Sequence, residues 1–334
     1  MIILALETSC DETSAAVVKD GREVLSNVVY SQMHTHARFG GVVPEVASRE
    51  HVKSILSVID EALSQAHIDA SALDAVAVTE GPGLIGSLLV GINAAKAFAF
   101  AHQKPLLGVH HIAGHIYANQ AVTPMVFPLL CLVVSGGHTE LILMEDHMRF
   151  TLLGQTQDDA IGEAYDKVAR VMGLGYPGGP KLDALAQSVT QSHLTMPKTQ
   201  LEGYDFSYSG LKSHVINTLN TAKMKGETIA QDALAHRFQE AALGQLIDQT
   251  RKALANHEVK QVLLAGGVAA NQRLRTWLKD AVAPIPLVVP PLSLCTDNAG
   301  MIGLAAYYQH QREGLKEGLA LNGYSRQTLF DRYR

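Results

Sequence analysis

The chain has 334 residues and a formal net charge of −5; 47% of its residues are apolar and 18% are charged. This apolar content excludes a disordered tail protein, and the negative charge argues against a protein that wraps nucleic acid through bulk electrostatics. Three dispersed cysteines, Cys10, Cys131 and Cys295, exclude a disulfide framework and a Cys-rich zinc module. A reducing, cytoplasmic location is expected.

Two apolar stretches, residues 81–95 and 121–137, are shorter than the ~20 residues that cross a bilayer, and Gly, Pro and Asn interrupt them. We expect them to be buried core segments and expect no membrane association. The apolar start of the chain, which runs to Leu6, lacks the basic region of a secretory leader. The mature chain is therefore expected to begin at Met1.

The first predicted element is a β-hairpin. Residues 2–18 run apolar, polar and apolar again, and a further strand is expected at residues 23–30. The same pattern recurs over residues 129–144. This recurrence predicts a structural duplication.

Helices alternate with short strands between and after the two hairpins. Apolar residues at helical spacing after Pro44 predict an amphipathic helix. The other expected helices cover residues 86–102, 161–172, 180–188, 229–255, 271–281 and 299–312, and the other strands cover residues 74–79, 106–109 and 261–265.

The alternation of strands and helices predicts an α/β fold with two lobes, each built on a mixed sheet. The last long helix is expected to return to the first lobe. We therefore expect an N-terminal lobe of residues 1–120 plus 299–334 and a C-terminal lobe of residues 121–298.

Glycine-rich turns follow several predicted strands. Residues 81–86 match GxGxxG, but no acid between Glu80 and Glu140 is available to bind a ribose, so a dinucleotide site is not expected. The absence of GxxxxGK[ST] excludes a P-loop NTPase. Backbone N–H groups of such turns bind phosphate without a lysine. The small-residue turns at residues 8–10, 135–139, 176–180 and 264–268 leave two interpretations open, a nucleotide between the lobes or close packing.

His111 and His115 directly follow a predicted strand. At positions i and i+4 of a helix they would share one face, which suits a metal ion, although structural histidines are the alternative and a distant third ligand would be needed. Ile112 replaces the Glu of HExxH, which argues against a zincin protease. Asp297, at a strand-to-helix junction, could cap a helix or bind a cation.

Several acidic residues lie in or beside polar turns. Asp11 and Glu12 are either solvated turn charges or general acid/base groups. The acidic pair at residues 158–159 could be no more than N-terminal helix charge. Asp166 and Asp183 each lie near a glycine turn, where a carboxylate can accept hydrogen bonds from ribose or amino groups.

Nine segments resemble, in order, those of the tRNA N6-adenosine threonylcarbamoyltransferase family, whose members were once described as O-sialoglycoprotein endopeptidases. They are LETSCDET (6–13), GGVVPE (40–45), GPGLIG (81–86), HIAGH (111–115), VSGGHT (134–139), YPGGP (176–180), DFSYSGLK (205–212), AGGVAAN (265–271) and CTDN (295–298). One departure is Ala113, where many members carry an acid that is not a ligand in the family. The resemblance extends from about residue 1 to residue 323.

The resemblance implies an actin-like (Hsp70-like and sugar-kinase-like) ATPase fold, with an RNase H-like mixed sheet in each lobe and a nucleotide cleft between the lobes. It also implies transfer of the threonylcarbamoyl group from threonylcarbamoyl-AMP to N6 of adenosine 37, in tRNAs that read codons beginning with A, with release of AMP. The implied partners are the tRNA anticodon loop, a shorter catalytically silent paralogue that pairs with the first lobe, and a small ATPase.

The resemblance also assigns site residues. His111, His115 and Asp297 match the family's metal ligands, with one divalent ion per subunit, iron ahead of zinc. The phosphate side of the substrate would be held by Val133, Val134, Ser135, Gly136 and Gly137, and ribose and base by Asp166, Gly179, Asp183 and Asn271. Asp11 or Glu12 is our hypothesis for the group that accepts the amine proton.

Two rival functions are considered. A metal-dependent glycoprotein endopeptidase would need a catalytic acid in the histidine motif, where Ile112 and Ala113 stand. A non-catalytic nucleotide-binding module would be expected to lack the set His111, His115 and Asp297, which is complete here.

Overall fold

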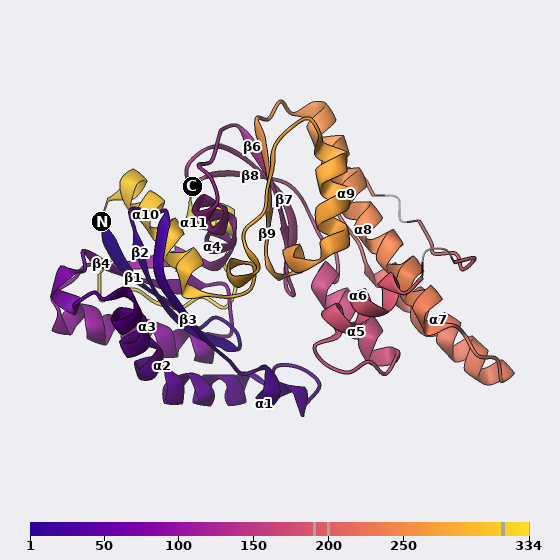
Figure 1. The fold of residues 1–334 in the computed structure, drawn as a ribbon, viewed down its shortest axis with the longest axis horizontal. Helices are drawn as coiled ribbons and strands as arrows, with labels where there is room; N and C mark the ends of the chain where they lie inside the picture. The colour runs from indigo at the N-terminus through magenta and orange to yellow at the C-terminus, as the bar shows by residue number, and fades with distance from the viewer. Residues whose placement is uncertain (190–191, 199–200, 315–317, 334) are drawn as a thin grey trace. The chain divides into compact units, whose positions relative to one another are not determined.

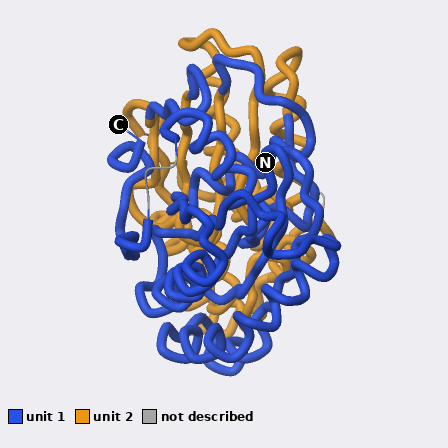
Figure 2. Tube along the Cα trace, turned by 90° about the vertical axis from the view of Figure 1, so that its left-hand side faces the viewer, with its two compact units in different colours: residues 1–129, 144–151, 288–334 blue, residues 130–143, 152–287 orange. Residues whose placement is uncertain are grey.

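The structure is a computed structural model, and it describes residues 1–189, 192–198, 201–314 and 318–333. The chain forms two compact units, coloured separately in Figure 2. The first unit comprises Met1–Leu129, Met144–Thr151 and Val288–Arg334, and the second comprises Leu130–Leu143 and Leu152–Leu287.

The first unit contains a five-stranded mixed sheet with the order β3-β2-β1-β4-β5. Its strands are β1 (Ile2–Glu7), β2 (Glu12–Lys19), β3 (Glu23–Ser31), β4 (Ala75–Gly81) and β5 (Leu106–His110). Strands β1, β2 and β3 pair antiparallel as a meander, whereas β4 pairs parallel with both β1 and β5. The expected hairpin is thus extended into a sheet that is covered on both faces.

Helices lie on both faces of this sheet (Figure 1). Alternate side chains of β1 and β2 pack against these opposite layers. Leu4, Leu6 and Val17 pack in one core with helices α2 (Pro44–Ala66) and α3 (Ile85–Ala101). Ala5 and Val18 face α10 (Ala299–Glu313) on the other side. Because both faces are buried, these strands are almost continuously apolar.

The second sheet has the order β10-β9-β6-β7-β8. Its strands are β6 (Leu129–Val134), β7 (Thr139–Asp146), β8 (Arg149–Gln155), β9 (Gln261–Ala265) and β10 (Leu287–Val288). The helices of the second unit are α5 (Ile161–Val171), α6 (Gly178–Gln187), α7 (Ser209–Lys225), α8 (Gln231–Asn256) and α9 (Gln272–Val282). The short helices α1 (Met33–Ala37), α4 (His111–Tyr117) and α11 (Leu329–Arg332) belong to the first unit.

The predicted duplication of a hairpin-led mixed sheet is confirmed, but helix α7 was not predicted. Only three of its side chains are buried, Leu211, Val215 and Ala222, so its apolar pattern is weak. Its N-terminus is capped from outside the helix, since Asp158 accepts hydrogen bonds from the backbone N–H groups of Tyr208 and Ser209.

The interpretation of the acidic pair 158–159 as charges at the start of the helix predicted for residues 161–172 needs correction. Asp158 also accepts hydrogen bonds from the hydroxyls of Ser207 and Ser209. Asp159 forms ion pairs with Lys167 on α5, at 2.7 Å, and with Lys212 on α7, at 2.6 Å. These acids therefore join two helices.

Among the described residues, no helix has both the length and the apolar content required to cross a membrane.

We predict that Gly303→Ala in α10 destabilises the protein. A Cβ at this position would lie 2.6 Å from Cγ2 of Val18 and 3.2 Å from Cβ of Ala5, so the helix would have to move off the sheet. Overpacking of this kind costs about 1–3 kcal/mol, and we expect a clear fall in Tm by scanning calorimetry.

The matched control is Gly244→Ala in α8, where nothing lies within 4 Å of the added Cβ. There, the substitution should stabilise the helix by about 0.5–1 kcal/mol. A Tm for Gly303→Ala at or above that of the wild type would contradict the tight seating of α10.

Candidate functional site

Helix α4 carries both histidines of the HIAGH motif. It follows β5 directly, and the side chain of His110 caps it by accepting a hydrogen bond from N–H of Ile112 at 3.2 Å. Residues i and i+4 share a helix face, and the imidazole centroids of His111 and His115 lie 4.7 Å apart. Every residue of α4 is buried.

Asp297 comes to these histidines from a distant part of the sequence, because α10 packs on α4. Gly114 makes the approach close, since a Cβ there would lie 2.8 Å from Cδ1 of Ile302. Asp297 does not cap α10, because Asn298 accepts the capping hydrogen bond from N–H of Met301 at 3.0 Å. The alternative that Asp297 is a helix cap is therefore wrong.

The three side chains form a compact donor set. Oδ1 of Asp297 lies 3.2 Å from Nε2 of His115 and 3.6 Å from Nε2 of His111, and the candidate ligand atoms all lie within 4.8 Å of one another. His115 is 1% exposed, and neither ring nitrogen forms a hydrogen bond in the described chain, because the contact of Nε2 with Asp297 lacks hydrogen-bond geometry. Burying an unsatisfied imidazole is costly, and a cation bound at Nε2 would satisfy one of its nitrogens.

The other ring nitrogen of His111 faces away from Asp297. Its Nδ1 lies 3.2 Å from Oε2 of Glu7 and 3.2 Å from Oγ of Ser9. Glu7, the last residue of β1, is completely buried. It was not among the predicted site residues, although a carboxylate that ends a buried apolar strand is a signal that the sequence contains.

Buried acids dominate the electrostatics of this site. Burial by itself would lower the pKa of His111, but Asp297 and Glu7 outweigh it and raise the pKa to about 9. Burial would raise the pKa of Glu7, and His111 overrides this and lowers it. Burial, Asp297 and Asp11 together raise the pKa of Glu12 to about 9. The site therefore favours an added positive charge.

Asp11 and Glu12 lie where β1 turns into β2, and the residues of this turn are buried or half-buried. Asp11 is 8% exposed, and Glu12 accepts a hydrogen bond from the hydroxyl of Ser31 at 3.3 Å. His51 of α2 fixes the turn, with Nε2 3.0 Å from the carbonyl oxygen of Cys10. The interpretation as a solvated turn charge is therefore wrong for Asp11, whereas Glu12 is half-buried.

Two glycine turns of the second unit lie side by side. Val133 and Val134 end β6, and the adjoining turn is closed by Oγ of Ser135, which accepts hydrogen bonds from N–H of Gly137 and His138. Gly266, with φ +92°, approaches so closely that a Cβ would lie 2.4 Å from the carbonyl oxygen of Val134. Only glycine fits such an approach.

The remaining predicted nucleotide contacts have partners within the second unit. Asp166 accepts hydrogen bonds from the N–H groups of Gly178, at 2.8 Å, and Gly179, at 3.1 Å, and so caps α6. Asp183 lies one turn further along α6 and accepts a hydrogen bond from Gln239 at 2.5 Å. Asn271 caps α9. The structure thus brings Asp166 and Gly179 together, while their contact with a nucleotide stays a prediction.

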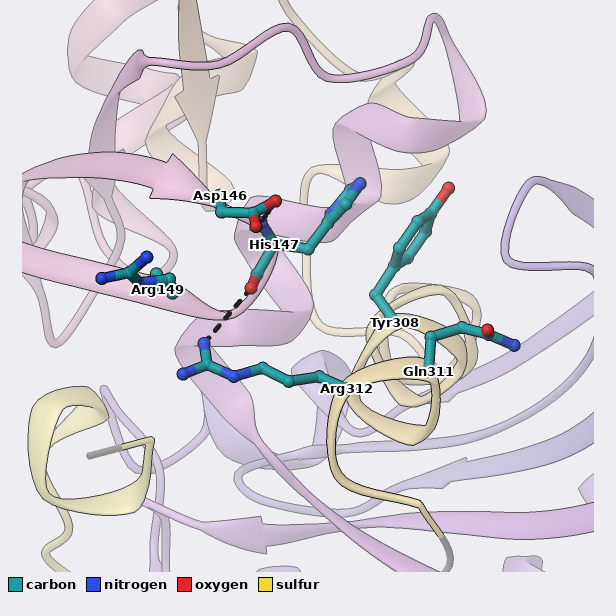
Figure 3. A pocket seen from close by; sticks show the side chains of 6 residues that line it. All are labelled: Asp146, His147, Arg149, Tyr308, Gln311 and Arg312. Atoms are coloured by element: carbon teal, nitrogen blue, oxygen red, sulfur yellow. Dashed lines mark hydrogen bonds between the residues drawn. The ribbon is translucent and has the colours of Figure 1, made fainter.

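A separate polar pocket of about 450 Å³ lies in the first unit and contains none of the predicted site residues. Its walls come from α10 and from the segment that joins β7 to β8 (Figure 3). Arg312 donates a hydrogen bond to the carbonyl oxygen of His147 at 3.3 Å, and the ring of Tyr308 stacks on His147 at 4.0 Å. We interpret these contacts as packing that anchors α10 to this turn.

Comparisons with solved structures concern the fold. Component A of the (R)-2-hydroxyglutaryl-CoA dehydratase of Acidaminococcus fermentans has a TM-score of 0.56 and 17% identity, over 93% of this chain and 99% of that one. HypF, in its phosphate- and nucleotide-bound form, has a TM-score of 0.61 and 13% identity, over 95% of this chain and 47% of that one. The predicted actin-like, sugar-kinase-like fold is confirmed.

Comparisons with sequences concern the family. The family described as TsaD, tRNA N6-adenosine threonylcarbamoyltransferase, matches residues 23–304. The protein of that name from Geobacillus thermodenitrificans is 60% identical over 96% of this chain and 94% of the relative, and that from Bacillus subtilis is 56% identical over 97% and 94%. Neither the endopeptidase nor the non-catalytic module is favoured by these relatives. The chain belongs to the tRNA N6-adenosine threonylcarbamoyltransferase family.

Proposed function

We propose that the protein transfers the threonylcarbamoyl group of threonylcarbamoyl-AMP to N6 of adenosine 37, in tRNAs that read codons beginning with A, and releases AMP. The observation that carries this proposal is the meeting of His111, His115 and Asp297 at one point, in a chain 60% identical to a relative named for this transfer. The histidines are 182 residues or more from Asp297 in the sequence, so their convergence is a property of the fold.

In this reaction the attacking amine loses its proton late, and AMP is a good leaving group. N6 of the adenosine attacks the carbamoyl carbon and forms the new C–N bond, while the bond from that carbon to the phosphate oxygen breaks and AMP leaves with the electron pair. The amine proton passes to Asp11 or Glu12.

His111, His115 and Asp297 would hold one divalent ion. Two imidazoles and a carboxylate suit iron and zinc, and the unsatisfied, buried ring of His115 fits a ligand. When bound, such an ion supplies a Lewis acid that stabilises negative charge on the carbamoyl or phosphate oxygens. The first unit supplies all three ligands.

The second unit would hold the adenylate. We assign the phosphate to the backbone N–H groups of residues 133–137, and ribose and base to Asp166, Gly179, Asp183 and Asn271. The close approach of Gly266 to Val134 supports this assignment, because backbone groups gather where side chains are excluded.

We expect Asp297→Ala and His115→Ala to lose both metal and activity. Each removes one of three protein ligands, and the loss of transition-state charge stabilisation should lower the rate at least about 100-fold. Metal content is measured by plasma mass spectrometry. Activity is measured as threonylcarbamoyl-adenosine in digested tRNA, after reaction with threonylcarbamoyl-AMP and the presumed partner proteins.

The matched control for this pair is Asp280→Ala, an exposed carboxylate on α9. It should retain the metal and the wild-type rate. If Asp297→Ala kept a stoichiometric ion and formed the product normally, the proposed centre would be wrong.

Glu12→Gln and Asp11→Asn test the proton acceptor. The amides keep the shape of the side chains but cannot take the proton, so the variant at the true acceptor should lose about 10²–10⁴-fold in kcat. KM for tRNA should change little. The exposed Glu23→Gln serves as the control. Wild-type kcat in both test variants would contradict general-base catalysis by this turn.

The proposal also includes the binding partners of the protein and its location in the cell. We assign a docking surface for the shorter silent paralogue to α2, where Val52 and Leu56 are 64% and 74% exposed and lie one turn apart on one face. A small ATPase would join this complex, and the tRNA would present its anticodon loop. We propose a cytoplasmic location, consistent with a tRNA substrate.

Leu56→Lys should disrupt the complex with the paralogue, because a charge would replace an apolar contact. Co-elution in size-exclusion chromatography checks this. Met224→Lys, at an 81% exposed apolar position on α7, is the matched control and should leave the complex intact. Equal co-elution of both variants would exclude α2 as the docking surface.

A further inference from the structure

Glu7 is a completely buried carboxylate whose partners are set by the sheet. The parallel pairing of β1 with β4 aligns Leu6 with Val78, so the next residues, Glu7 and Thr79, are neighbours across the strands. The hydroxyl of Thr79 donates a hydrogen bond to Oε2 of Glu7 at 2.5 Å.

The two oxygens of Glu7 face different partners. Oε1 accepts a hydrogen bond from the backbone N–H of Ser9, and Oε2 also lies 3.2 Å from Nδ1 of His111. An ionised carboxylate only accepts hydrogen bonds, so Nδ1 of His111 must carry the proton in this contact. The lone pair of the neutral ring is then on Nε2, the nitrogen that lies 3.6 Å from Oδ1 of Asp297.

We propose that Glu7 is a positioning residue that fixes His111 in the tautomer whose Nε2 can bind a cation beside His115 and Asp297. A ring nitrogen that binds a metal needs its lone pair, and a carboxylate behind the imidazole fixes both the tautomer and the ring orientation. The inference rests on the cation-binding part of the proposed function. It assigns to Glu7 a role that acts through His111 and does not touch the substrate.

Glu7→Gln should reverse the tautomer with little change in shape. The backbone N–H of Ser9 can only donate, so the amide oxygen of the new glutamine must take the place of Oε1. The amide NH₂ then faces Nδ1 of His111 and donates to it. A neutral His111 would consequently carry its proton on Nε2, where the proton blocks cation binding.

The control variant is Thr79→Val. It removes the other side-chain hydrogen bond to Oε2 of Glu7 but leaves the carboxylate facing Nδ1 of His111. A loss of binding that came merely from disturbing this buried network would therefore appear in both variants. A loss caused by the tautomer would appear only in Glu7→Gln.

The experiment measures binding of Zn²⁺ and Co²⁺ to the chelator-stripped full chain, by competition with a chromophoric chelator and by the Co²⁺ absorption spectrum. We expect one ion per chain in the wild type, affinity within about threefold of wild type for Thr79→Val, and affinity 10–100-fold weaker for Glu7→Gln, the range typical of lost outer-shell partners. Tm values of the stripped proteins report whether each variant folds.

A second measurement needs no variant. In the ¹⁵N-labelled, Zn²⁺-loaded wild type, long-range ¹H–¹⁵N correlations should show His111 with its proton on Nδ1. A proton on Nε2 would overturn the inference, as would equal affinity of Glu7→Gln and the wild type. If the wild type binds neither ion, the cation-binding part of the proposed function fails as well, which separates the two failures.

Discussion

The candidate site depends on the burial of like charges in one place. Glu7, Glu12 and Asp297 act on one another or on His111 through a medium that screens poorly, which is why the pKa of His111 rises to about 9 even though burial opposes it. A cluster of buried acids is stable when nearby positive charge balances its negative charge. The contacts around it therefore serve to hold acids together that would otherwise repel one another.

The three candidate ligands are brought together by the packing of helices and strands, more than by the structure of local loops. His111 begins α4 at the end of β5, His115 lies one turn later, and Asp297 lies just before α10. Gly114 lets α10 reach α4, and Gly303 lets the same helix reach β2. The spacing between the imidazoles and the carboxylate thus follows from two close helix contacts, each of which requires the absence of a side chain.

Local patterns in the sequence predicted the hairpin-led sheets and the shared face of His111 and His115, because both depend on spacings of two to four residues. Contacts between residues far apart in the sequence could not be predicted from these patterns. Helix α7 takes its cap from Asp158, about 50 residues earlier in the chain, and Glu7 meets His111 across 104 residues. The place of Asp297 came from the family resemblance alone, since no local pattern relates residue 297 to residue 111.

The hydrogen bond from His51 to the carbonyl oxygen of Cys10 ties a long helix to the acidic turn. His51 lies on α2, and the same ring contacts the hydroxyl of Thr13 at 2.8 Å. The ring therefore contacts the turn on both sides of Asp11 and Glu12. The contacts of His51 thus connect α2 directly to the turn that carries these carboxylates. The position of the two acids is therefore set by α2 as well as by the strands that the turn connects.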